Sequence, residues 1–417
     1  MPKRVDGTAD IVIAGGGFVG SALALALAGP ADAASGLSVA VLDAGPARGG
    51  GPTDQRASAV TAASRRMLMR LGAWCDLDRL AQPVAEMVIT DSRLDQAARV
   101  PFLVFQTEEG ADDGMPAAWI VENPHLAKTL GGAVRRHRGI AISHGVRVAG
   151  FEPDGAGVTV RTDGGRSFRA RLLVAAAGAG AGLNRLAGIR GIAWDYGQWA
   201  LAATIRPGRD HAGKAVQHFL PAGPFAMLPL RNRRGSLVWT EGREEARRLI
   251  GLDEPAFIVE LTRRLGRQFG ALALAGPRQA FPLGFFMARD FIAPRFALAG
   301  DAAHRFHPLA GQGVNIGFKD AAALAETVLE AARIGLDIGA LSVLERYQRW
   351  RRFDTAGLAL ATDALNRLFS NDSDLARIAR DVGLGLVERL PGLKRAFVRE
   401  AAGDTGTLPR LLRGEAV

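Results

Sequence analysis

The stretch from Phe296 to Asp320 constrains the fold more than any other part of the chain. Residues 296–299 form a short apolar run, which predicts a buried strand. Asp301 follows at the carboxyl end of that strand, the edge at which α/β sheets bind their ligands. Residues 311–313 read Gly-Gln-Gly and predict the start of a helix that continues to Glu326. The free N–H groups of such a helix start favour a negative charge, so the stretch predicts a strand, a binding loop and a helix.

A dinucleotide-binding unit is predicted at the amino terminus. A β-rich run at residues 10–14 leads into Gly15-Gly-Gly-Phe-Val-Gly20, a helical run and a second strand that ends in Asp43. Gly15 would make the tight turn, Gly17 would let a pyrophosphate approach the backbone, and Gly20 would let helix and strand pack closely. Asp43 follows Gly20 at roughly the 20-residue spacing at which an acid binds ribose hydroxyls. Together with the downstream Gly-Asp motif, this unit predicts FAD rather than NAD as the bound dinucleotide.

The downstream stretch closely resembles the second FAD-binding motif of flavoprotein monooxygenases with the p-hydroxybenzoate hydroxylase fold. From His307 to Asp320 it reads His-Pro-x-Ala-Gly-Gln-Gly-x-Asn-x-Gly-x-x-Asp, which is similar to the UbiH/VisC-type, FAD-dependent hydroxylases of ubiquinone biosynthesis. The resemblance covers essentially the whole chain, including the run Leu-Asn-Arg-Leu-Phe-Ser-Asn at residues 365–371. It implies an α/β fold in which a Rossmann-like FAD-binding domain is interleaved with an antiparallel-sheet substrate domain and followed by C-terminal helices.

The resemblance also implies domain boundaries. The expected FAD-binding domain is discontinuous and comprises residues 1–75, 120–190 and 280–340. The expected substrate domain comprises residues 76–119 and 191–279, and the C-terminal helical region comprises residues 341–417.

The same resemblance implies which residues would hold FAD. Asp301 would hydrogen-bond the ribityl chain, and Pro308 with the turn at 311–313 would lie against the isoalloxazine ring. Arg56 would lie near the FAD ribose and pyrophosphate. Pro308, Gly311 and Gln312 are expected to face the flavin, and no side chain is assigned as a catalytic acid or base. The full set of expected cofactor-binding residues is Gly15, Gly17, Gly20, Asp43, Arg56, Asp301, Pro308, Gly311, Gln312, Gly313, Val314 and Asn315.

The chain departs from the family pattern after a predicted strand near residue 172. Where relatives have Ala-Asp-Gly, then a small residue, Ser and Arg, this chain has Ala177, Ala181 and Asn184 at the Asp, Ser and Arg positions. In relatives this motif serves both the FAD pyrophosphate and the reduced nicotinamide cofactor. Losing its carboxylate removes a charge-assisted hydrogen bond of about 1.5–3 kcal/mol. FAD binding can survive on the two intact motifs, whereas NADPH or NADH as electron donor stays open.

Composition narrows the classes of partner. The formal net charge of +10 favours anionic partners, namely nucleic acid, an acidic lipid surface or an acidic protein. Without a zinc-finger spacing or an aromatic-interleaved basic motif, nucleic acid is not predicted. The single cysteine, Cys75, excludes an intramolecular disulfide, and its apolar surroundings predict a buried structural thiol.

The amino-terminal residues 9–29 are almost wholly apolar, but their embedded glycines favour the nucleotide turn over a signal peptide or membrane span. We therefore expect a cytoplasmic protein, with peripheral association with the inner membrane left open. The stretches at 390–399 and 408–413 are basic and amphipathic. One interpretation is that they dock to a membrane surface or to subunits of a ubiquinone-biosynthesis complex. The other is that they form helices that close their own domain.

Other chemistry is not indicated. His304 and His307 are spaced as a metal pair could be, but no further ligand completes a set, so no metal is expected. Ser58 and Ser64 lack the context of a catalytic nucleophile. Four large apolar side chains of the predicted substrate sheet fit ordinary core better than substrate contacts: Phe219, Phe225, Met227 and Trp239.

Three functions follow from these observations. The first, implied by the resemblance, is an FAD-dependent monooxygenase that uses O2 to hydroxylate the aromatic ring of a polyprenylated phenol through a flavin C4a-hydroperoxide. The cofactor carries that chemistry, and the protein must exclude water. Only Tyr196 and Tyr347 are present, so a tyrosine pair that orients the phenol is not expected. The second is a hydroxylase-like subunit that is non-catalytic or depends on another electron donor, as Ala177 suggests. The third is an FAD reductase or an epoxidase of an isoprenoid chain.

Overall fold

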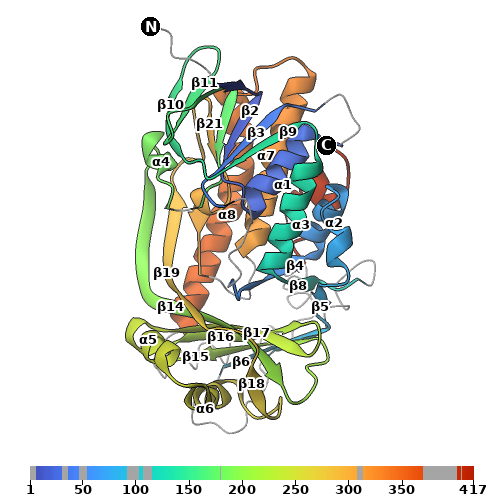
Figure 1. Ribbon diagram of the computed structural model, residues 1–417, viewed down its shortest axis with the longest axis vertical. Coiled ribbons are helices and arrows are strands. Elements are labelled where there is room, and N and C mark those ends of the chain that lie inside the picture. Colours follow the sequence, from blue (N-terminus) through green and yellow to red (C-terminus); the bar gives the residue numbers. More distant parts are fainter. Residues whose placement is uncertain are drawn as a thin grey trace.

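The computed structural model describes residues 6–30, 36–46, 54–91, 103–106, 115–178, 180–307, 313–369, 402–404 and 406–417. Figure 1 shows a parallel sheet with its helices at one end of the molecule and a broad, mainly antiparallel sheet at the other. Two long paired strands, β14 (Gly191–Pro207) and β19 (Gln279–Ala288), run between the two ends. The chain therefore builds each end from segments that are far apart in sequence.

The parallel sheet carries the predicted dinucleotide-binding unit. Its strands are, in spatial order, β20 (Ile292–Ala293), β21 (Phe296–Leu298), β13 (Leu172–Ala175), β2 (Ile11–Ala14), β3 (Val39–Asp43) and β9 (Ile140–His144), with β20 antiparallel to the rest. Every residue of β2, β13 and β21 is buried, as expected for parallel strands covered on both faces. Helix α1 (Phe18–Ala28) packs against α3 (Asn123–Arg136) and α7 (Gly313–Arg333).

Two smaller sheets accompany the parallel sheet. The first pairs β1 (Gly7–Thr8), β12 (Ser167–Ala170), β11 (Val158–Thr162) and β10 (Val148–Pro153). The second pairs β4 (Ala57–Thr61), β8 (Ala118–Glu122) and β5 (Gln82–Pro83).

The broad sheet has nine strands among the described residues. Besides β14 and β19 these are β22 (His304–Arg305), β17 (Arg234–Gly242), β16 (Gly223–Leu230), β15 (Lys214–Leu220), β6 (Glu86–Asp91), β7 (Leu103–Gln106) and β18 (Leu272–Leu274). Only β15 and β6 pair in parallel. Helices α5 (Arg243–Gly251) and α6 (Glu254–Leu265) cover the face turned away from the parallel sheet (Figure 1).

That covered face holds a separate hydrophobic core. Phe225, Met227 and Trp239 pack there with side chains of α5 and α6, so the prediction that they are core residues is confirmed. Phe219 is also buried, but strand alternation puts it on the opposite face from Val216 and Leu220.

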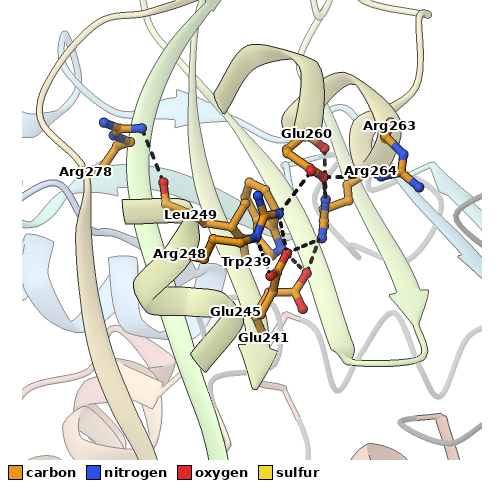
Figure 2. A network of polar contacts seen from close by, with 9 residues as sticks. All are labelled: Trp239, Glu241, Glu245, Arg248, Leu249, Glu260, Arg263, Arg264 and Arg278. Atoms are coloured by element: carbon orange, nitrogen blue, oxygen red, sulfur yellow. Dashed lines mark hydrogen bonds and ion pairs between the residues drawn. The ribbon is translucent and has the colours of Figure 1, made fainter. Parts of the chain in front are cut away.

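A buried ion cluster, which we call the Arg264 cluster, holds α5 and α6 on the covered face of the broad sheet (Figure 2). The Arg264 guanidinium donates hydrogen bonds to Glu241 (2.8 Å), Glu260 (2.5 Å) and Glu245 (3.3 Å). It also lies 4.6 Å from the ring centroid of Trp239, whose Nε1 donates to Glu241 at 2.8 Å. Arg264 and Glu241 are buried, so these contacts replace the water that both charges give up on folding.

The chain between residues 243 and 265 forms two helices rather than one. The chain breaks into α5 and α6 because Leu252 is extended and Asp253 caps the second helix, accepting a hydrogen bond from Ala256 N at 2.9 Å. Pro255 follows in the first turn of α6, where its missing N–H costs nothing. The run Asp-Glu-Pro was the available signal for this break.

The prediction that Cys75 is buried is wrong, because its side chain is exposed. Cys75 begins a short 3-10 turn, η1 (Cys75–Leu77), in which residues three apart share a side. Trp74 and Leu77 occupy the buried side, so the thiol between them faces outward. The preceding helix, α2 (Ala62–Arg70), ends with Leu71 as its C-cap, and Gly72 follows with a positive φ of 67°.

The C-terminal region contributes α8 (Leu341–Phe369), which packs on α7, β20 and β16, and the short helix η5 (Arg410–Arg413), which packs on α2 and α7. Leu411 and Leu412 are buried, so the basic stretch at 408–413 closes its own domain. The companion stretch at 390–399 lies outside the described residues. No helix in the described part of the chain is both long and apolar enough to cross a membrane.

Candidate functional site

The glycine turn between β2 and α1 lies at the carboxyl edge of the parallel sheet. Gly15 has a φ of 109°, and a Cβ on it would lie 2.5 Å from the Cα of Ala177. A Cβ on Gly20 would lie 1.9 Å from the carbonyl oxygen of Gly15. Both positions therefore require glycine for close backbone packing, as the sequence predicted.

Gly17 differs, because a Cβ on it would meet nothing within 4 Å. It is the N-cap of α1, and it offers no side-chain hydrogen bond to the first-turn N–H groups. An uncapped helix start beside open space is suited to a phosphate group. The turn thus fits the pyrophosphate of a dinucleotide.

Asp43 ends β3, next to the glycine turn on β2. Its carboxylate accepts a long hydrogen bond from Gly45 N (3.4 Å), and its Oδ2 lies 3.4 Å from Nδ1 of His144. His144 could not be recognised from the sequence as a neighbour of Asp43, because the two meet only through the register of β3 and β9.

The charges of Arg56 and Asp301 act on each other, although 245 positions separate them in the sequence. Arg56 forms a two-point ion pair with Asp54 (2.9 Å at each contact), and its guanidinium lies 4.8 Å from the ring centroid of Phe281 on β19. The hydrogen bonds that Arg56 donates to Asp54 raise the pKa of Arg56, and the charge of Asp301 adds to this effect.

Asp301 lies in η3 (Gly300–Ala302), directly after β21. Its side chain is accessible to solvent but closely surrounded by protein, and this confinement raises the pKa of its carboxyl group against the opposing charges of His304, Arg305 and Arg56. A confined but accessible carboxylate is well suited to accept hydrogen bonds from ligand hydroxyl groups.

Behind Asp301 lies a group of buried contacts that we call the Asp320 cluster. Gly300 N (2.9 Å) and His304 Nε2 (2.6 Å) contact Oδ2 of Asp320. Arg351 Nε donates to the other oxygen, Oδ1, at 2.7 Å. Burial opposes ionisation of Asp320, but His304 and Arg351 outweigh it and keep the pKa of Asp320 below its usual value.

The Asp320 cluster ties β22, α7 and α8 to the backbone just before Asp301. Gly300 has a φ of 62°, a conformation that favours glycine, and a Cβ there would lie 3.0 Å from the Val19 side chain. Tyr347 of α8 adds support by donating a hydrogen bond to Leu298 O on β21 (2.7 Å). His304, considered above as half of a metal pair, thus has a structural partner in Asp320.

The helix predicted after the Gly-Gln-Gly turn is present, because α7 begins at Gly313 and includes Val314 and Asn315. Asn315 is hydrogen-bonded to strand β4, donating to Ala59 O (2.7 Å) and accepting from Thr61 N (3.1 Å). The remaining expected flavin-facing residues lie outside the described residues: Pro308, Gly311 and Gln312.

The altered motif lies at the same sheet edge. Ala177 follows β13 and lies against Gly15, and Gly178 has a φ of 79°. Asn184 lies in the short helix α4 (Leu183–Leu186), and its side-chain amide donates a long hydrogen bond to Ile189 O (3.5 Å). The Asn184 side chain therefore stabilises the turn that follows α4.

The two serines have local structural partners. Ser58 Oγ donates to Asn123 Oδ1 at 2.8 Å, and Ser64 N donates to the Thr61 side chain that caps α2 at 3.3 Å. Within the described ranges, no three His, Cys, Asp or Glu side chains converge as metal ligands.

Comparison with known proteins agrees with this geometry. The sequence profile of the family described as "FAD binding domain" matches residues 8–352. Ubiquinone hydroxylase UbiL of Rhodospirillum rubrum is 39% identical over 419 residues, covering 98% of this chain and 94% of the relative. The 3-demethoxyubiquinol 3-hydroxylase of Escherichia coli is 32% identical, covering 94% and 98%. The chain belongs to the family of FAD-dependent ubiquinone-biosynthesis hydroxylases.

The hydroxylase also resembles solved structures. The p-nitrophenol 4-monooxygenase PnpA from Pseudomonas putida has a TM-score of 0.77 at 20% identity, covering 97% of this chain and 100% of that chain. PqsL from Pseudomonas aeruginosa has a TM-score of 0.74 at 23% identity, covering 90% and 100%. These likenesses concern the fold and confirm the predicted α/β architecture. FAD is the cofactor of this hydroxylase, and the open space at Gly17 with the confined carboxylate of Asp301 fits it.

Proposed function

We propose that this hydroxylase inserts one oxygen atom of O2 into the aromatic ring of a polyprenylated phenol during ubiquinone biosynthesis. The supporting observation is that the glycine turn, Asp43 and Asp301 lie at one edge of the parallel sheet, beside strands that lead to the broad sheet. Two relatives that match nearly the whole chain are named ubiquinone hydroxylase and 3-demethoxyubiquinol 3-hydroxylase. This coverage favours a catalytic protein over a hydroxylase-like subunit without activity.

Each residue at this edge receives a role in the proposal. The start of α1 at Gly17 holds the FAD pyrophosphate, and Asp43 accepts hydrogen bonds from the ribose. Asp301 accepts hydrogen bonds from the ribityl chain, and the positive charge of Arg56 lies close to it. Pro308, Gly311, Gln312, Gly313, Val314 and Asn315 complete the proposed set around the flavin and the start of α7.

When bound, FAD supplies the activation of O2, and the protein positions the ring and excludes water. The proposed division of labour follows the domain boundaries given above. FAD is held by residues 1–75, 120–190 and 280–340. The substrate is covered by residues 76–119 and 191–279. The C-terminal region, residues 341–417, supports the flavin site. Contacts of Tyr347 and Arg351 with β21 and Asp320 support the last assignment.

The electron donor is the point at which this chain differs from the family pattern. We propose that NADPH or NADH reduces the bound flavin slowly, because Ala177 and Asn184 offer neither the carboxylate nor the guanidinium of the family motif. A protein partner in a ubiquinone-biosynthesis complex would then supply electrons faster. The net charge of +10 also supports peripheral association with the anionic inner membrane, where a polyprenylated substrate resides.

The first experiment is the visible spectrum of the purified protein, followed by anaerobic addition of NADPH or NADH. A flavin spectrum that bleaches slowly, and O2-dependent hydroxylation of a prenylated phenol, are the expected results. A protein that takes up no FAD, or that consumes O2 without hydroxylating any phenol, would contradict the proposal.

A variant tests the assignment of the altered motif. Ala177→Asp restores the family carboxylate, and the rate of flavin reduction by NADPH or NADH is expected to rise roughly tenfold, as one charge-assisted hydrogen bond allows. Leu186→Asp is the matched control, because it adds the same charge at an exposed position of α4. An unchanged reduction rate in Ala177→Asp would show that Ala177 does not limit use of the donor.

A further inference from the structure

An aromatic wall lines the junction between the two long strands and the segment after Asp301. Trp194 of β14 stacks on Phe285 of β19, with ring centroids 3.8 Å apart and ring planes 5° apart. Phe306 lies 5.8 Å from Phe285, and Tyr196 meets Trp194 edge-on at 6.2 Å. The wall ends at His307, whose ring lies 5.6 Å from that of Tyr196 at an angle of 72°.

The strand β14 is irregular where it presents this wall. Its pairing with β19 shifts register between Asp195 and Trp199, and Gly197 has a φ of 68°. Such a bulge bends a strand and re-aims its side chains, and bulges occur often beside active sites. The bulge here adjoins Tyr196, the residue that contacts His307.

His307 is buried, yet neither of its ring nitrogens has a hydrogen-bond partner in the part of the chain that the structure describes. Burial lowers the pKa of His307 to about 4, so the ring is neutral near pH 7 and offers one donor and one acceptor nitrogen. Buried polar atoms are almost always paired in folded proteins, and an unpaired one indicates a missing ligand atom or water.

We propose that His307 is the residue that binds the ring hydroxyl of the phenol substrate, accepting a hydrogen bond from it, while the aromatic wall packs against the ring. This inference rests on the proposed function. The described ring contact of His307 is with Tyr196 of β14, the strand that leads to the broad sheet proposed to cover the substrate. The expected ligand is therefore the substrate rather than the FAD ribityl chain or pyrophosphate.

The proposal also explains how a hydroxylase with two tyrosines orients a phenol. Tyr347 is fully buried and donates its hydroxyl to Leu298 O, so it cannot reach a substrate. A neutral imidazole acceptor favours a phenol over a compound that lacks the hydroxyl donor. His307 thus acts as a specificity-determining residue.

The test measures binding without turnover. FAD-loaded, oxidised protein is titrated with a short-chain prenylated phenol and with the methyl ether of the same phenol, using the shift in the flavin absorbance as the signal. The wild type is expected to bind the phenol about tenfold more tightly than the ether, as one hydrogen bond allows. His307→Phe keeps an aromatic ring without polar atoms, and it is expected to bind both compounds with nearly equal Kd.

Two control variants separate the outcomes. His307→Asn, which keeps an acceptor, is expected to recover part of the preference for the phenol. His125→Asn, at a partly exposed position of α3, is expected to match the wild type. Retention of the full preference in His307→Phe would overturn the inference, as would an FAD affinity that falls in parallel with phenol binding. If the FAD-loaded wild type binds no phenol, both this inference and the proposed substrate class are wrong.

Discussion

The Asp320 cluster and the Arg264 cluster are chemically alike but hold different backbones. Each places a buried arginine against a buried carboxylate, at 2.7 Å for Arg351 and Asp320 and at 2.8 Å for Arg264 and Glu241. The Asp320 cluster also receives the backbone N–H of Gly300, the residue before Asp301. The Arg264 cluster joins β17, α5 and α6 on the face of the broad sheet turned away from the FAD edge (Figures 1 and 2).

The difference teaches that burial of an ion pair does not mark a functional site. Desolvation makes both clusters costly to break, whatever they hold in place. What separates them is the segment that each one orients, a cofactor-facing turn in one case and two covering helices in the other. Variants that break each cluster should therefore have similar effects on stability and different effects on FAD.

The largest combined effect is expected for Asp320→Asn. The change removes the buried carboxylate that pairs with Arg351 and His304, and it leaves Asp354, at 3.2 Å, as the remaining ion-pair partner of Arg351. Breaking a buried pair in this way costs about 3–5 kcal/mol of unfolding free energy. Gly300 also loses its charged acceptor, so FAD affinity is expected to fall by about tenfold or more. Chemical unfolding and FAD titration of the apoprotein measure the two effects. If the Asp320→Asn protein folds and binds FAD with unchanged affinity, the Asp320 cluster supports the helices and does not contribute to FAD binding.

Arg264→Met is the matched change in the other cluster. It leaves Glu241 buried without its cation, so a loss of about 3–5 kcal/mol in unfolding free energy is again expected. FAD affinity is expected to stay near the wild-type value, because no described contact of the cluster reaches the glycine turn, Asp43 or Asp301. A fall in FAD affinity comparable to that of Asp320→Asn would show that the two ends of the molecule are coupled.

His307 sharpens the comparison as a buried titratable group without a charge partner in the described chain. Its pKa is about 4 in the folded protein and about 6.5 when unfolded, so the unfolded state takes up the proton first as the pH falls. Stability should therefore be lost as the pH drops from 6.5 towards 4. Relative to His307→Phe, the wild type should lose roughly 2 kcal/mol of unfolding free energy between pH 7 and pH 5. Parallel pH profiles of the two proteins would contradict the lowered pKa.

The local elements of this protein could be read from its sequence. The strand, glycine turn and helix around Gly15 depend on short-range backbone requirements, which the residue types state directly. The same holds for the strand at Phe296 and the helix that starts at Gly313. The wrong prediction for Cys75 belongs to this level too, because the 3-10 turn that directs its side chain outward is formed by neighbouring residues.

Only the tertiary structure decided which distant side chains meet. His144 reaches Asp43 through strand register, and Arg351 reaches Asp320 from a different helix. The packing of separate segments brings Arg56 within range of the charge of Asp301. His307 was visible in the sequence as a neighbour of Pro308, but its burial and its position at the end of an aromatic wall were not. Local backbone preferences are encoded by neighbours in sequence, whereas these contacts depend on how sheets and helices pack over long separations.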